Sequence, residues 1–293
     1  MLTATQLEAQ TQSPPKRIRS LPSLEQQYRA YLMQRIEDYK DSLTREDLLR
    51  LGDVAARELQ GGADDQFVLT EMLMQETVDQ QIIKRLNLPT FRKWRSKILP
   101  LREAQRSPTR WGIRTTDPVS QVLPRLEPGD RILVVGGGAE HAAYLLAAHD
   151  TEIKCLVGDT SAADRIEGKL ASESLSGQCC VYVLKLGGGW LPADVTGPFH
   201  LVVMDAAAVA PLPREQQRTL ILQAQQRTAP DGLHALVSSD ADIAPEGYLS
   251  HYPDWQRIVP AGDPVTKTSG QGLRGLLLSG PPVPPATSLT SIR

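Results

Sequence analysis

The stretch "PGDRILVVGGGAEHAAYLL", residues 128–146, decides the fold that we expect for this chain. An apolar run ends directly in three glycines, and a helix-forming segment follows them. Glycines at the end of a buried strand let the backbone approach a ligand closely, and the next helix presents free N–H groups and the positive end of its dipole. The stretch therefore predicts a nucleotide-binding turn between a strand and a helix of an α/β domain.

From Val122 onward, apolar runs alternate with helical patterns. The expected strands are 131–135, 153–157, 179–184, 200–204 and 233–238, with a closing hairpin at 255–259 and 272–278. The expected helices are 141–149, 162–174 and 215–228. Continuous apolar strands that alternate with helices predict a mostly parallel sheet covered on both faces. Residues 122–280 are therefore expected to form a Rossmann-like α/β domain with seven strands.

Three further segments follow the glycines in a fixed order. "CLVGDTS" ends the second strand with Asp159, "GPFHLVVMDAA" ends the fourth with Asp205, and "APDGLHALVSS" leads into the fifth. In this order and spacing, the chain resembles the class I S-adenosylmethionine-dependent methyltransferases over residues 122–279. The resemblance implies a Rossmann-like methyltransferase fold, S-adenosyl-L-methionine as cofactor, and transfer of its methyl group to an acceptor.

The same resemblance implies roles for single residues. Asp159 would hold the ribose hydroxyls, Leu186 would lie near the adenine, and Asp205 would line the site beside the methyl group as the candidate catalytic residue. From the residues alone, Asp159 could equally cap the helix that "DTSAAD" begins. The implied cofactor-binding residues are Gly136, Gly137, Gly138, Asp159, Leu186 and Asp205.

The chain departs from the family pattern at two positions beside the glycines. Val134 stands where the family has an acid that contacts the amino-acid end of the cofactor, and Glu140 replaces the third glycine. One alternative is therefore a catalytically inactive methyltransferase fold that binds a partner. An NAD-type domain is another, because "ILVVGGG" also suits dinucleotide enzymes, although the fourth and fifth segments argue against it. A third is a DNA-binding regulator with an α/β scaffold.

The N-terminal part shows helical periodicity and no strand pattern. Residues 23–106 are expected to form an all-α domain with helices over 24–43, 45–59, 66–86 and 90–99. Residues 107–121 are expected to be a linker that Trp111 anchors against the α/β domain. The leader, 1–22, and the tail, 281–293, are rich in polar residues and proline and are expected to be disordered.

A basic band lies inside an otherwise acidic protein. Residues 81–114 carry ten Lys and Arg and one acid, Glu103, in a chain whose net charge is −2. Within the band, "QIIKRLNLPTFRKWRSKI" (81–98) is similar to a helix-turn-helix, which predicts nucleic-acid contact through its second helix. The alternative is a helical hairpin with a solvated charged face. The candidate contact residues are Arg92, Lys93, Arg95 and Lys97.

The acceptor of a methyl group is not identified by any motif. "DAAAVAP" follows the fourth strand, where enzymes that methylate base amino groups carry an Asn-Pro-Pro-Tyr-type signature. That argues against this one class and leaves RNA, protein or a small molecule open, with nucleic acid favoured by the basic band.

The remaining composition limits the other classes of function. Cys155, Cys179 and Cys180 form no metal-binding pattern and are expected to be reduced core residues, so no metal site is predicted. No run reaches the ~18–20 apolar residues that span a bilayer, and the first residues lack a signal-peptide pattern. A cytoplasmic location without membrane contact is therefore expected.

Overall fold

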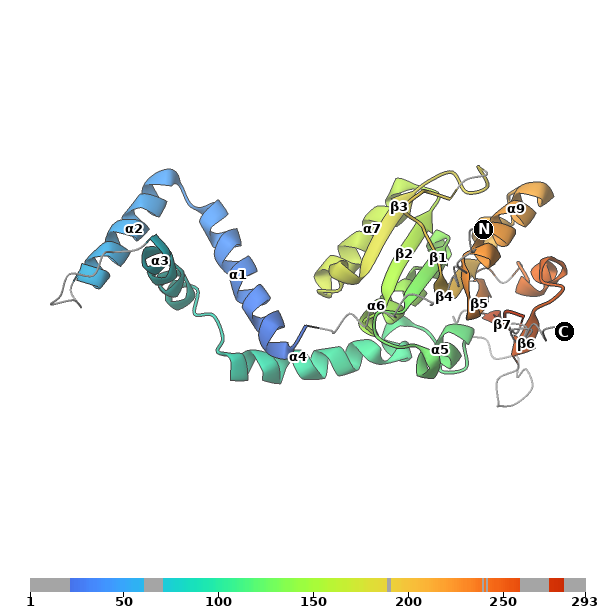
Figure 1. The fold of residues 1–293 in the computed structure, drawn as a ribbon, viewed down its shortest axis with the longest axis horizontal. Helices are drawn as coiled ribbons and strands as arrows, with labels where there is room; N and C mark the ends of the chain where they lie inside the picture. Colours follow the sequence, from blue (N-terminus) through green and yellow to red (C-terminus); the bar gives the residue numbers. More distant parts are fainter. Residues whose placement is uncertain are drawn as a thin grey trace, which may run out of the picture. The chain divides into compact units, whose positions relative to one another are not determined.

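The structure is a computed structural model, and it describes residues 22–60, 71–188, 191–238, 240, 242–258 and 274–281. Contacts divide the chain into two compact units, a helical unit of residues 22–103 and an α/β unit that begins at Ala104 (Figure 1). The predictions of a disordered leader and tail fall on residues 1–21 and 282–293, which lie outside the described residues. The beginning of the third predicted helix, residues 66–70, lies outside them too.

Helices α1 (Leu24–Ser42), α2 (Arg45–Gln60), α3 (Glu71–Arg85) and α4 (Phe91–Arg106) follow one another in the N-terminal part. Ile36, Leu51 and Ile82 are buried together and join the first three. The fourth helix was expected to end at Leu99, and that boundary is wrong because α4 continues through Pro100. Proline removes one backbone hydrogen bond, but the bonds on either side of it keep the helix continuous.

The α/β unit contains a seven-stranded sheet in the order β3-β2-β1-β4-β5-β7-β6. Strands β1 to β5 are parallel, and β7 runs antiparallel to both of its neighbours, β5 and β6. The predicted α/β fold with a mostly parallel seven-stranded sheet is therefore confirmed. The strands are β1 (Arg131–Val135), β2 (Glu152–Val157), β3 (Cys179–Val183), β4 (Phe199–Asp205), β5 (Thr228–Ser238), β6 (Gln256–Ile258) and β7 (Arg274–Ser279).

The sheet is buried on both faces because its strands carry apolar side chains at consecutive positions. Ile132 and Val134 of β1 point into one apolar cluster with α6 (Glu140–Ala148) and α7 (Thr160–Ser172). Leu133 and Val135 point into the opposite cluster with α8 (Ala206–Val209) and α9 (Arg214–Gln226). The connections also contain α5 (Pro118–Val122) and five 3₁₀ helices, which are η1 (Pro108–Trp111), η2 (Leu123–Arg125), η3 (Gly137–Ala139), η4 (Ser176–Gln178) and η5 (Pro245–His251).

Two details of the sheet differ from the sequence prediction. Strand β5 begins at Thr228, five residues before the expected start, and its pairing register with β4 shifts at the Pro-Asp-Gly segment that looked like a turn. Cys180 was expected in the core, and this prediction is wrong because its side chain is exposed. The physical reason is that β3 lies at the edge of the sheet, where helices cover it less completely.

The segment between the helices and β1 packs into the α/β unit. Trp111 is 4% exposed, donates from Nε1 to the Gln105 carbonyl at 2.6 Å, and lies with its ring centroid 5.4 Å from that of Tyr144. Ile113 and Val119 are buried in the same cluster. The anchoring role predicted for Trp111 is therefore confirmed. Among the helices that the structure describes, no helix has the length and apolar character to cross a bilayer.

Candidate functional site

The glycine turn lies at the carboxyl end of β1, where the sheet order reverses between β2 and β4. Gly136 has a φ of +100°, a backbone conformation that side chains other than glycine rarely adopt. A Cβ atom at this position would lie 2.6 Å from Cβ of Ala208 and 2.7 Å from Cβ of Asp205. Gly136 therefore lets the backbone of the turn lie close to α8 of the same chain, in place of a ligand.

Asp205 ends β4 and bonds to the backbone on both sides of the turn. Its Oδ2 accepts the N–H of Gly138 at 3.1 Å, and its Oδ1 accepts the N–H of Ala207 at 3.0 Å. The side chain is buried, and this burial raises its pKa, with a further upward effect from Asp240, against the lowering effect of the backbone bonds. The candidate catalytic residue thus ties the glycine turn to α8 in this structure.

Tyr248 of η5, a third segment, contacts α8 next to Asp205. Its side chain is buried, and its hydroxyl donates to the carbonyl of Ala206 at 3.2 Å. Burial raises the pKa of this phenol, and the neighbouring Asp205 raises it further. The phenol is therefore protonated at neutral pH and acts as a hydrogen-bond donor.

Asp159 follows β2 and begins α7 as its N-cap. Its Oδ1 accepts the N–H of Ala162 and the hydroxyl of Ser161, each at 2.8 Å. These two bonds lower the pKa of the carboxyl group, so the exposed side chain is ionised at neutral pH. The helix-cap interpretation is confirmed. The exposed carboxylate thus stands at the carboxyl edge of the sheet.

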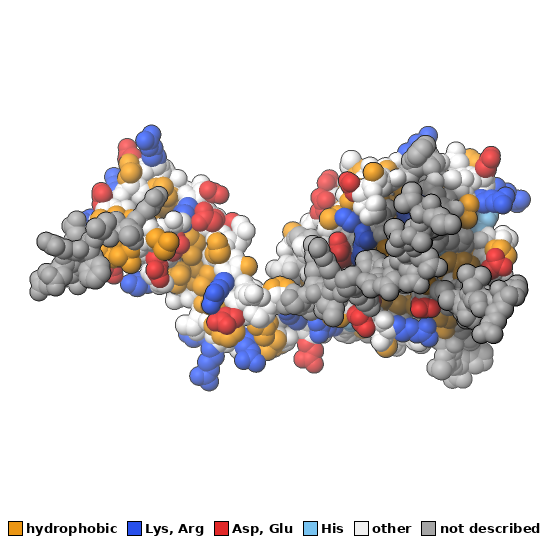
Figure 2. All heavy atoms as spheres, viewed as in Figure 1, with side chains coloured by type: hydrophobic (Ala, Val, Ile, Leu, Met, Phe, Trp, Pro, Cys, Tyr) orange, Lys and Arg blue, Asp and Glu red, His pale blue; other side chains and the backbone are white. Residues whose placement is uncertain are grey.

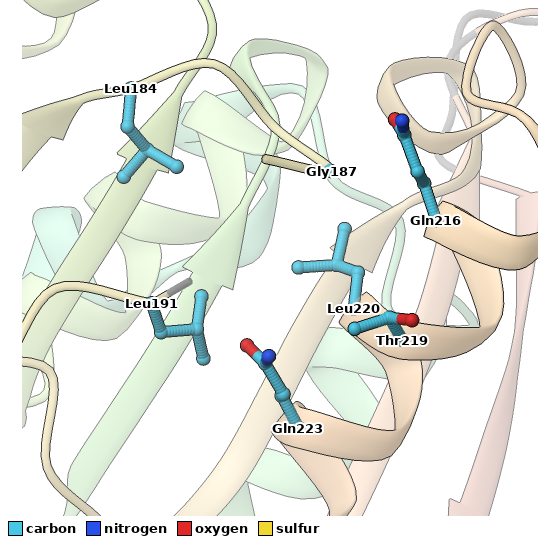
Figure 3. A pocket seen from close by; sticks show the side chains of 7 residues that line it. All are labelled: Leu184, Gly187, Leu191, Gln216, Thr219, Leu220 and Gln223. Atoms are coloured by element: carbon cyan, nitrogen blue, oxygen red, sulfur yellow. The ribbon is translucent and has the colours of Figure 1, made fainter. Parts of the chain in front are cut away.

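The adenine position implied by the resemblance lies after β3. Leu186 is buried and packs in the apolar cluster with α9. Next to Gly187, between the β3–β4 connection and α9, is a small hollow of about 10 Å³, which has room for no more than about one water molecule. Figure 3 shows leucines of the β3–β4 connection facing α9 across this space. The residues around it are Leu184, Gly187, Leu191, Gln216, Thr219, Leu220 and Gln223.

The two departures from the family pattern have ordinary structural roles. Val134 is fully buried between β2 and β4, where an acid would have no partner. Glu140 lies in the first turn of α6 and forms an ion pair with Arg165 of α7 at 3.1 Å. The negative charge of Glu140 is therefore balanced by Arg165 on the neighbouring helix.

A larger hollow of about 380 Å³ lies at the opposite edge of the sheet, where β1, β4 and β5 begin. Its polar lining comes from Arg125, Glu127, Asp130, His200 and Asp231. Ligands of open α/β sheets bind at the carboxyl ends of the strands, so this hollow is not the expected cofactor position. In the described part of the chain, no group of three or more His, Cys, Asp or Glu is placed to hold a metal ion.

These observations test whether S-adenosylmethionine fits the carboxyl edge. At the ribose end, the carboxylate of Asp159 is exposed at the start of α7, which suits a pair of hydroxyl donors. At the methionine end, the N–H of Gly138 is taken by Asp205, and Ala208 packs on Gly136. The residues fit the ribose, while the methionine half is filled by the chain itself.

The four basic candidates of the helical unit lie on α4 and are all exposed. The structure brings them together on the first two turns of one helix, in a unit separate from the carboxyl edge. The contact of Ala208 with Gly136 had no sequence signal, because it joins residues that are far apart in the chain.

Comparisons with known proteins complete this description. No family model and no curated protein matches the sequence. Among solved structures, an rRNA methylase from Streptococcus thermophilus is similar at 10% identity, over 56% of this chain and 93% of that one, with a TM-score of 0.44. The glycopeptide N-methyltransferase MtfA has 12% identity, 60% and 100% coverage, and a TM-score of 0.44. A SAM-dependent O-methyltransferase from Thermotoga maritima has 14% identity, 57% and 66% coverage, and a TM-score of 0.40. The order of the strands and the antiparallel β7 show that the α/β unit has a Rossmann-like fold with a mostly parallel seven-stranded sheet.

Proposed function

We propose that this chain is a methyltransferase-like protein that binds S-adenosyl-L-methionine at the carboxyl edge of its sheet. The observation that carries the proposal is the ionised carboxylate of Asp159, which is exposed after the end of β2. A carboxylate at this place in a Rossmann-like sheet accepts the hydroxyls of a ribose. The cofactor, when bound, supplies an electrophilic methyl group, and the protein contributes orientation.

The chain's own residues would hold the nucleoside and the acceptor in different places. Asp159 would accept the ribose hydroxyls, and the backbone around Gly137, which is partly exposed, would face the nucleoside. Asp205 would reach an acceptor only after its bond to the Gly138 N–H opens, because both of its oxygens are bonded to backbone. The proposed acceptor is a nucleic acid, because residues 81–114 carry ten basic residues and one acid.

The proposal is tested by calorimetric titration of the full chain with S-adenosylmethionine, S-adenosylhomocysteine and NAD. We expect binding of the two adenosylated sulfur compounds and none of NAD. Replacement of Asp159 by serine should weaken that binding at least ten-fold, since it removes the ribose-binding carboxylate. Serine is also a good N-cap, so α7 keeps its first hydrogen bond and the thermal midpoint should change by only a few degrees.

A second candidate function is a catalytically inactive methyltransferase fold that binds a partner. The observation in its favour is the filled methionine half, where Asp205 bonds to Gly138 and Ala208 packs on Gly136. In this case, neither S-adenosylmethionine nor S-adenosylhomocysteine would give heat at millimolar concentration.

An equal affinity of the wild type and Asp159→Ser for S-adenosylmethionine would contradict the ribose role and leave the first candidate without its main support.

A further inference from the structure

The connection between α3 and α4 fixes the direction in which α4 begins. The N–H of Leu88 bonds to the carbonyl of Ile83 at 3.1 Å, and the N–H of Asn87 bonds to that of Lys84 at 3.2 Å. With Asn87 at a φ of +47°, this is a Schellman ending, and asparagine takes the left-handed position that glycine usually occupies. The Tyr28 hydroxyl donates to the Pro89 carbonyl at 2.8 Å and holds the turn against α1. The hairpin is therefore a defined structure.

An aromatic cluster decides which face of α4 is buried. Trp94 is 9% exposed, and its ring centroid lies 5.5 Å from that of Tyr28, 6.2 Å from Tyr31 and 6.3 Å from Phe91. Ile98, one turn after Trp94, is half-buried on the same side. The opposite side of α4 consequently faces solvent along its first two turns.

The exposed side of α4 carries cations on two flanks. Arg92 and Arg95 are three residues apart and are neighbours on one flank, while Lys93 and Lys97 are four residues apart and are neighbours on the other. The small side chain of Ser96 lies between the flanks and is exposed. Figure 2 shows Lys and Arg side chains in blue that project from the helical unit where α4 begins.

None of these four cations has an acidic partner among the described residues, whereas several other cations of the same unit do. Elsewhere in the unit, Arg29 pairs with Glu25 at 3.6 Å, and Lys40 pairs with Asp79 at 2.9 Å. The first turn of α4 contains no acid, although acids there would be favoured by the helix dipole and cations are not. The helix dipole therefore does not favour these cations, and their exposed side chains are accessible to an external polyanion.

We propose that the helical unit binds double-stranded DNA by placing the start of α4 in the major groove. A helix with its side chains is about 10–12 Å wide, and the major groove of B-form DNA is about 12 Å wide. With Ser96 directed into the groove, the arginine flank and the lysine flank would each face the phosphates of one strand. The major groove of an RNA duplex is too deep and narrow for this arrangement.

The binding is mainly electrostatic, since the outermost side chain is a serine and the cations stand at the flanks. This inference rests on the nucleic-acid preference proposed above and names duplex DNA as the bound class, and it does not require the duplex to be the methyl acceptor. It predicts a steep salt dependence, because each neutralised phosphate contributes about −0.9 to the slope of log K against log salt. Four contacts correspond to a slope of about −3 to −4.

The experiment measures fluorescence anisotropy of a labelled mixed-sequence duplex with the full chain between about 50 and 200 mM KCl, without S-adenosylmethionine. We expect Arg92→Gln/Arg95→Gln and Lys93→Gln/Lys97→Gln each to weaken binding at least ten-fold and to reduce the slope by about 2. The matched control is Arg35→Gln/Arg50→Gln, which removes two exposed cations that pair with acids in the same unit. Circular dichroism checks that every variant is folded.

The outcomes separate this proposal from its competitors. Unchanged binding in both double variants of α4, or an equal loss in the control variant, would overturn it. An RNA duplex or a single strand bound as tightly as the DNA duplex would also overturn it, since neither offers a groove of the required width. Failure here together with binding of S-adenosylmethionine would move the acceptor to another class and leave the cofactor proposal intact.

Discussion

Alanine at position 136 is expected to lower the free energy of unfolding of the α/β unit by on the order of 4 kcal/mol. Two effects add. A non-glycine residue at φ +100° is strained, which costs about 1–3 kcal/mol. The new Cβ would also lie 2.6 Å from Cβ of Ala208 and 2.7 Å from Cβ of Asp205, so α8 would have to move. Urea denaturation followed by tryptophan fluorescence measures the change.

Two companion variants make this prediction specific. Gly168 lies on an exposed position of α7 with no atom near its missing Cβ, so Gly168→Ala should stabilise the unit by about 0.5–1 kcal/mol. Ala208→Gly in the Gly136→Ala background removes the nearest overlapping atom and should recover part of the loss. A Gly136→Ala variant with a wild-type urea midpoint would show that the turn does not pack against α8.

The strands of the sheet were predictable because their signal is local. Strand β1, Arg131–Val135, was predicted with the same bounds, because its run of apolar residues ends directly at the glycines. The helix-cap role of Asp159 was readable for the same reason, as its partners Ser161 and Ala162 lie within three residues. Short-range patterns of this kind carry the architecture of a parallel sheet.

The chemistry of the carboxyl edge could not be derived in the same way. Whether Asp205 faces a ligand or the Gly138 N–H depends on two segments that are 67 residues apart in sequence. The burial of Leu186 beside α9 and the exposure of Cys180 on an edge strand depend likewise on the packing of the whole sheet. A family pattern implies where a ligand lies, but the packing of a side chain such as Ala208 decides how much space is left for that ligand.

His234 provides the second large prediction, a loss of stability in mild acid. The ring lies in β5 and is fully buried, with Nε2 2.7 Å from the Thr228 hydroxyl and Nδ1 3.0 Å from the Tyr252 hydroxyl. The Thr228 hydroxyl donates to the Ala224 carbonyl at 2.8 Å, so it accepts from Nε2, and Tyr252 donates to Nδ1. The neutral imidazole is thus fully bonded. Burial lowers its pKa from 6.5 to about 3.

The sign of the effect follows from the proton balance. Below about pH 6.5, the unfolded chain binds a proton at His234 that the folded chain does not bind until about pH 3. The free energy of unfolding therefore decreases as the pH is lowered through this window, by about 1.4 kcal/mol per unit at most, and this contribution is constant above it. Urea midpoints between pH 7 and pH 5 measure the fall in a range that avoids titration of most carboxylates.

A His234→Gln variant isolates this group from the other titrating residues. Glutamine can still donate to Thr228 and accept from Tyr252, but it binds no proton in this range. Burial also lowers the pKa of His149, so a smaller slope of the same sign is expected in both proteins. Between pH 6 and pH 5, unfolding of the wild type should take up close to one proton more than unfolding of the variant, which gives the wild type the steeper pH dependence. Equal slopes would mean that His234 is already protonated in the folded chain, or that Tyr252 turns to accept from it, which the hydrogen bonds of Thr228 and Tyr252 argue against.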